Sequence, residues 1–156
     1  MSVNNVQSNF SNGMSYSANL VSTTIPTQSL VPIQAITAAT TLTPTQSGST
    51  FTVSQVAAYD VTLPALQSGL NYKFICVGAA ANTVGIKAAS GTPIVGWAMY
   101  GPHAGVVSVQ GAGTLRVNFV ASKAGNGDMI QLHCDGTNWF AQGFSGSNTT
   151  ASITFA

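Results

Sequence analysis

The sequence predicts an all-β protein: an antiparallel β-sandwich or jelly roll preceded by an extended N-terminal arm. Three observations support this prediction. Short runs of alternating apolar and polar residues recur from residue 42 onward, glycine-containing turn sequences separate them, and no stretch keeps a helical period. Only 4% of the 156 residues are charged and glutamate is absent, so salt-bridged surface helices are excluded.

The first 41 residues are expected to form the arm. They carry no charge and are rich in Ser, Thr, Asn and Gln, with prolines inside short apolar groups. An uncharged, moderately apolar arm suits a path along another protein surface better than free exposure to water, although a disordered tail is the alternative. The residues expected to make this contact are Ile25, Pro26, Leu30, Val31, Pro32 and Ile33.

Residues 42–156 are expected to form the sandwich from about eight to ten short strands. The clearest alternation covers residues 50–54, 60–63, 72–76, 115–119 and 130–135. Weaker candidates are residues 84–88, 93–99, 106–110, 138–142 and 152–155. A solenoid or β-helix is not favoured, because no repeat of about 20–50 residues is present.

Turn residues separate these runs. Asp135-Gly136 is the best hairpin signal and would join residues 130–134 to residues 138–142. Gly69 and Gly127 can adopt positive φ in turns that lead into strands, and Pro64 would end an edge strand. Trp139, just after the hairpin turn, is expected to plug one end of the core.

The two cysteines are expected to be buried thiols. Cys76 and Cys134 each fall on the apolar phase of an alternating run and show no metal-binding spacing. A disulfide between them is the alternative.

The chain carries few groups for chemistry. His133, Cys134 and Asp135 are consecutive, so a strand would point Cys134 away from its two neighbours, and His103 follows Gly101-Pro102 in an expected loop. We expect no enzyme activity, no cofactor and no metal site.

The sequence also leads us to expect no binding to nucleic acid, no membrane span and no secretion signal. A net charge of +1 cannot supply the basic stripe that nucleic acid requires. No apolar stretch reaches the roughly 18 residues of a membrane helix. The N-terminus has no secretory pattern, so synthesis in a host cytoplasm is expected.

An ordered set of motifs spans about residues 40–144. It comprises Leu42–Pro44, Ser47-Gly48, Val61–Pro64, Gly69–Ile75, Gly127–Leu132 and Asp135–Trp139. This pattern resembles small β-domains of tailed-phage and large-virus virion proteins, which occur in head fibres, capsid decoration (cement) proteins and tail fibres. The resemblance brings no catalytic residues with it.

Together these features predict a capsid decoration protein on the outer surface of the virion. It would stabilise the head shell by binding the major capsid protein, as a homotrimer, because a surface with so few charges suits coverage by copies of itself. The alternative is a tail-fibre or receptor-binding module that binds carbohydrate. Its stacking residues would be Trp97, Tyr100 and Trp139, which could equally lie in the core or at a subunit interface.

Overall fold

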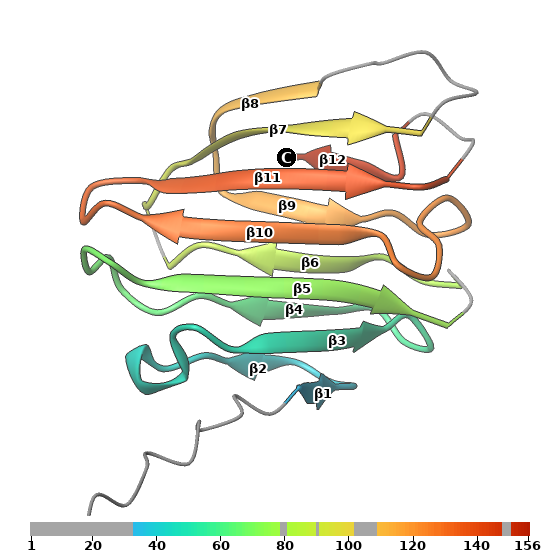
Figure 1. Ribbon diagram of the computed structural model, residues 1–156, viewed down its shortest axis with the longest axis horizontal. Coiled ribbons are helices and arrows are strands. Elements are labelled where there is room, and N and C mark those ends of the chain that lie inside the picture. The colour runs from blue at the N-terminus through green and yellow to red at the C-terminus, as the bar shows by residue number, and fades with distance from the viewer. Residues whose placement is uncertain (1–32, 79–80, 90, 102–108, 148–150) are drawn as a thin grey trace, which may run out of the picture. The chain divides into compact units, whose positions relative to one another are not determined.

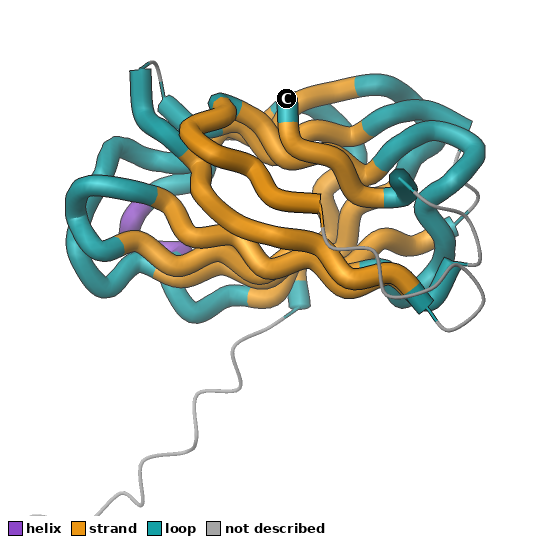
Figure 2. The backbone as a smooth tube through the Cα atoms, turned by 90° about the horizontal axis from the view of Figure 1, so that it is seen from above, coloured by secondary structure: helices purple, strands orange, loops and turns teal. Residues whose placement is uncertain are grey.

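The computed structural model describes residues 33–78, 81–89, 91–101, 109–147 and 151–156 (Figure 1). These residues form two β-sheets that pack face to face, which confirms the predicted all-β sandwich. Figure 2 shows the strands as two layers with loops at both ends. A single 3-10 turn, Pro44–Gln46, is the only helical element among the described residues.

The larger sheet, sheet A, has seven strands and the smaller, sheet B, has five. In spatial order, sheet A contains β1 (Gln34–Ile36), β3 (Thr50–Ser54), β5 (Asn71–Val77), β10 (Met129–Cys134), β11 (Trp139–Ser145), β7 (Ile94–Tyr100) and β8 (Val109–Thr114). Sheet B contains β12 (Ile153–Phe155), β9 (Arg116–Phe119), β6 (Val84–Lys87), β4 (Tyr59–Thr62) and β2 (Thr40–Thr41). Each run of residues predicted to be a strand overlaps one of these elements.

The first six strands wind as a coil. Each strand crosses to the opposite sheet, so that β1, β3 and β5 are neighbours in sheet A, and β2, β4 and β6 are neighbours in sheet B. All four of these neighbouring pairs are parallel, because a chain that completes one turn of a coil returns in its original direction. The expected antiparallel pairing therefore holds only in part: β10 pairs antiparallel with β5 and β11, and β9 with β6 and β12.

The boundary between arm and sandwich lies earlier than residue 42. Strands β1 and β2 fall inside the expected arm, yet β1 pairs with β3 and β2 pairs with β4. Ile36 is buried, and its backbone carbonyl accepts a hydrogen bond of 2.6 Å from the Tyr59 hydroxyl. The sandwich therefore begins close to Ile33, the residue before β1.

Most of the expected capsid-contact residues lie outside the described part of the chain. These are Ile25, Pro26, Leu30, Val31 and Pro32. Ile33, the first described residue, is 65% exposed.

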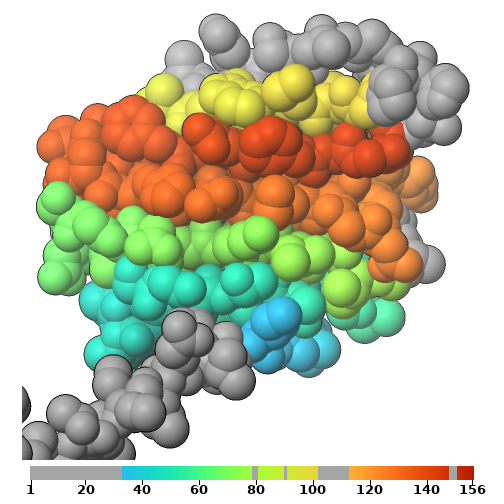
Figure 3. Space-filling view, in the orientation of Figure 1, coloured from blue at the N-terminus to red at the C-terminus, as the bar shows by residue number. Residues whose placement is uncertain are grey.

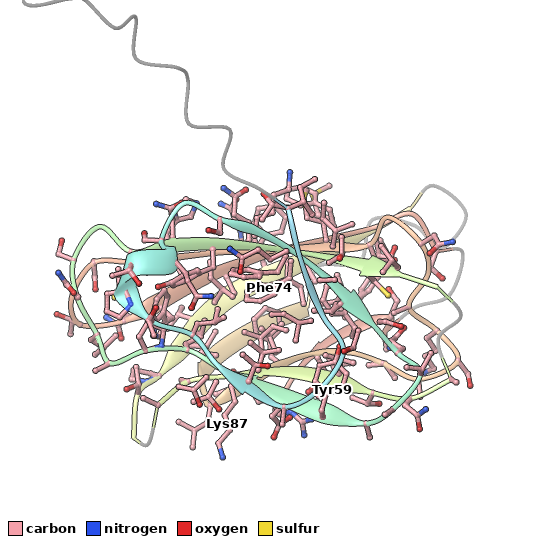
Figure 4. All side chains as sticks on the ribbon, turned by 90° about the horizontal axis from the view of Figure 1, so that it is seen from below. Tyr59, Phe74 and Lys87 are labelled. Carbon is pink, nitrogen blue, oxygen red and sulfur yellow. The ribbon has the colours of Figure 1, made fainter. Side chains whose placement is uncertain are left out.

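Apolar side chains from both sheets fill the space between the layers. The rings of Phe51 and Phe74 stack with their centroids 5.6 Å apart, and those of Tyr72 and Trp139 lie 5.9 Å apart. Figure 4 shows Phe74 between the layers and Lys87 projecting away from sheet B. Trp139 is fully buried, which confirms its predicted role as a core plug.

The predicted hairpin between β10 and β11 is present. Gly136 has a φ of +98°, and Asp135 Oδ1 accepts hydrogen bonds of 2.7 Å from the backbone N–H groups of Thr137 and Asn138. These hydrogen bonds favour the charged carboxylate and lower the pKa of Asp135. Gly69 and Gly127 also have positive φ, as expected.

Gly96 in β7 provides a direct test of this packing. A Cβ atom at this position would lie 1.9 Å from the backbone carbonyl oxygen of Ala141 on β11. We predict that Gly96→Ala lowers the free energy of unfolding by about 3 kcal/mol, since the two strands would have to separate. Urea unfolding measures the change.

Gly125→Ala is the matched control. Nothing lies within 4 Å of a Cβ atom built on Gly125, so we expect a change within about 0.5 kcal/mol. Equal stability of the two variants would contradict the packing of β7 against β11.

Candidate functional site

The outer face of sheet A carries an unusual concentration of apolar side chains. On β5, β10, β11 and β7, the strand register places Ile75 beside Met129, Met129 beside Phe144, and Phe144 beside Met99. We call these four residues the apolar row. They alternate with buried neighbours along each strand, so they point away from the core. Met99 is 37% exposed and Phe144 is 38% exposed.

Further apolar groups adjoin this row. The ring of Trp97 packs edge-to-face against Phe144 at a centroid distance of 5.4 Å. Phe140, four residues before Phe144 on β11, is 43% exposed and lies opposite Val95 of β7. The apolar surface therefore extends along β11 and β7 as well as across the four strands. These strands lie side by side on the face of the molecule seen in Figure 3.

The polar groups of this face are almost all neutral. Gln131 and Gln142 lie opposite each other between the apolar row and Phe140. Among the described outward side chains of sheet A, the titratable groups are Lys73 and His133. Removing a face of this kind from water costs little free energy, because the desolvation of amides is less unfavourable than the desolvation of charges.

The outer face of sheet B is different. The Arg116 side chain of β9 crosses over Gly85 of β6 and forms an ion pair of 2.5 Å with Asp60 of β4. A Cβ atom on Gly85 would lie 1.9 Å from Arg116 Nε, so glycine is what allows this crossing. Both partners are about one-third exposed, and the pair ties three strands together with a modest energy, about 1 kcal/mol or less.

A buried polar cluster lies at one end of the sandwich. Asp128 is 1% exposed, and its carboxylate accepts hydrogen bonds from Gly125 N–H at 3.0 Å, Gly146 N–H at 3.0 Å and the Ser145 hydroxyl at 2.9 Å. Ser152 and Ser145 share a hydrogen bond of 2.7 Å. These hydrogen bonds join the loop before β10 to the end of β11 and to Ser152, which precedes β12.

Cys76 lies beside this cluster. Its Sγ donates a hydrogen bond of 3.2 Å to Gln55 Oε1, and Gln55 Nε2 in turn donates to two backbone carbonyls. Burial, together with the nearby Asp128, raises the pKa of the Cys76 thiol to about 11. Cys134 is also buried, and neither thiol forms a disulfide, as predicted.

The three predicted stacking residues do not form one surface. Trp139 is fully buried and Tyr100 is 4% exposed, with its hydroxyl donating to the backbone carbonyl of Ile153. Both rings lie in the core, which is the alternative that the sequence left open for them, so neither is placed to stack on a sugar at the surface. Trp97 alone is half-buried on the outer face.

The histidine, cysteine and aspartate residues that the sequence offered for catalysis or metal binding do not come together. His133 is exposed on β10, Cys134 points inward and Asp135 lies in the hairpin turn; His103 lies outside the described residues. In the described ranges no three His, Cys, Asp or Glu side chains come together as a metal site requires. Nor does any helix there have the length and hydrophobicity needed to cross a membrane.

Sequence reasoning missed the apolar row. Its signal is an apolar residue on the polar phase of an alternating run, as at Ile75 and Phe144. Within one strand such a residue is only an exception to the alternation. The register between strands is what places these exceptions side by side.

No family model, curated protein or solved structure matches the chain at a significant level. Its function therefore has to be inferred from its own residues.

The raised pKa of Cys76 predicts a loss of stability at high pH. The unfolded chain releases this proton near pH 9 and the folded protein only near pH 11. The contribution of the protonated Cys76 thiol to the free energy of unfolding is therefore complete below pH 9. It declines between pH 9 and pH 11, by at most about 1.4 kcal/mol per pH unit. Urea unfolding at several pH values measures it.

Cys76→Ser should remove this part of the pH dependence while leaving the part due to Tyr59, Tyr72 and Tyr100, whose pKa values burial also raises. Cys134→Ser is the matched control and should leave the Cys76 contribution in place. Identical pH profiles for wild type and Cys76→Ser would contradict the prediction.

Proposed function

We propose that the chain is a virion structural protein that decorates the outer surface of a capsid and stabilises the head shell. It acts as a homotrimer and binds the major capsid protein. The observation that carries the proposal is the neutral, apolar outer face of sheet A, since such a face suits lasting contact with protein.

The use of the charged groups supports a structural role. Asp60 is paired with Arg116, Asp128 is buried as a hydrogen-bond acceptor and Asp135 holds a turn. All three carboxylates of the chain are thus engaged in folding. General acid–base catalysis needs a titratable group placed beside a substrate, and none of these three is available for it.

The sequence pattern that resembles virion β-domains supports the location. Its motifs run from the segment after β2 to the start of β11, and therefore through most of the sandwich. Gly69, Gly127 and Gly136 of that pattern all have positive φ, so they are turn positions that the fold requires.

We predict that residues 1–32 carry the attachment to the shell. The protein without these residues should keep its thermal unfolding transition, because β1 and Ile36 remain in place. It should not attach to particles. In a density gradient, the full chain is expected to sediment with particles that lack the protein, and the truncated chain is expected to stay at the top.

A truncation that also removes residues 33–41 is the control. It deletes β1 and β2 and should lower the transition temperature, because β3 and β4 lose their neighbours. Attachment of the chain without residues 1–32 would contradict the proposed role of this segment, and sedimentation of neither protein would contradict attachment to the shell.

A tail-fibre or receptor-binding role is the second candidate. The exposed ring of Phe140 and the half-buried Trp97 favour it, because aromatic rings on a flat sheet can stack on sugars. Gold-labelled antibody on intact particles separates the two: label on the head supports decoration, and label on the tail supports the fibre role.

A further inference from the structure

We infer that the outer face of sheet A is the surface through which copies of this chain contact one another, with the apolar row at its centre. The inference rests on the homotrimer of the proposed function and adds which surface joins the subunits. The occupant of the face is therefore a second copy of this chain.

The side chains on this face are of the kind that protein interfaces bury. Aromatic residues and methionine are enriched at the centres of interfaces, and Phe144, Met99 and Met129 form the middle of the apolar row. Trp97 packs against Phe144, which gives the row an aromatic anchor. A sugar could stack on the aromatic rings of this face, but it has few apolar groups to pack against the flexible methionine side chains.

The charge of the face favours a copy of itself. Its described titratable groups are Lys73 and His133, and it has no carboxylate. An acidic partner would find few cations here, and a basic partner would find no anions. In a closed threefold ring each copy meets two neighbours, and the amides of Gln131 and Gln142 can hydrogen-bond to polar groups of the adjoining neutral faces, because an amide both donates and accepts.

The size of the face is close to what a stable contact needs. Five neighbouring strands, from β3 to β7 in sheet A, span about 24 Å, and seven residues of β5, β11 or β7 span about 23 Å. The projected area is then about 550 Å². A specific interface needs about 800 Å² of accessible surface per partner, which a corrugated face of this projection approaches.

Charge placed in the apolar row should separate the copies. Wild-type protein at micromolar concentration is expected to scatter light with three times the monomer mass of 15.9 kDa. The Met99→Glu/Phe144→Glu double variant should fall to the monomer mass, since burying two unpaired carboxylates per subunit is unfavourable. Val56→Glu is the control: Val56 is 73% exposed and lies off this face, so the trimer should remain.

The outcomes distinguish the inference from the proposed function. A trimeric double variant would overturn the assignment of this face while leaving the homotrimer intact. A monomeric wild-type protein would overturn both the interface and the homotrimer. Loss of the trimer in the double variant but not in Val56→Glu supports the inference.

A second measurement does not depend on charged variants folding. Gln142 is exposed in the single chain and lies next to the apolar row, so Gln142→Cys should react with a maleimide at least tenfold more slowly than Val56→Cys in the trimer. The native thiols are buried and add little background. Equal rates at the two positions would overturn the inference.

Discussion

The alternation of side chains along each strand links the interior of this protein to its surface. A strand that buries every second residue must present the others on the opposite face. In sheet B those residues include an ion pair and a lysine. In sheet A they include the apolar row, whose four members the strand register aligns. The same register that closes the core therefore also builds the candidate interaction surface.

The small number of charged residues also limits what the surface of this protein can be made of. With three carboxylates in the whole chain, each has a structural task, and that of Asp128 is to satisfy donors from Gly125, Ser145 and Gly146 at the end of the sandwich. Apart from Lys73, Lys87 and His133, the outward polar side chains of the described strands are mostly neutral amides and hydroxyls. A protein of this composition has few charges to keep its copies apart, and the apolar row is the surface where we propose that they meet.

The sequence predicted the strands well because alternation is a local property. It predicted Trp139 as a core plug from its place just after the hairpin turn. It left Tyr100 open between stacking and the core, because the Ile153 carbonyl that its hydroxyl contacts is distant in the chain. Parallel pairing in the coil of β1 to β6 was not predictable, because successive turns differ in length and leave no repeat. β1 and β2 were missed because strands of three and two residues bury too little to show a pattern. The apolar row depends on inter-strand register, which no single segment encodes.

We propose that neutral, apolar surfaces hold copies of this chain together. Sedimentation equilibrium in low salt and in 1 M sodium chloride tests this directly, because salt screens contacts between charges and leaves apolar contacts in place. We expect three times the monomer mass of 15.9 kDa at both salt concentrations. Dissociation at high salt, or a monomer under both conditions, would contradict it.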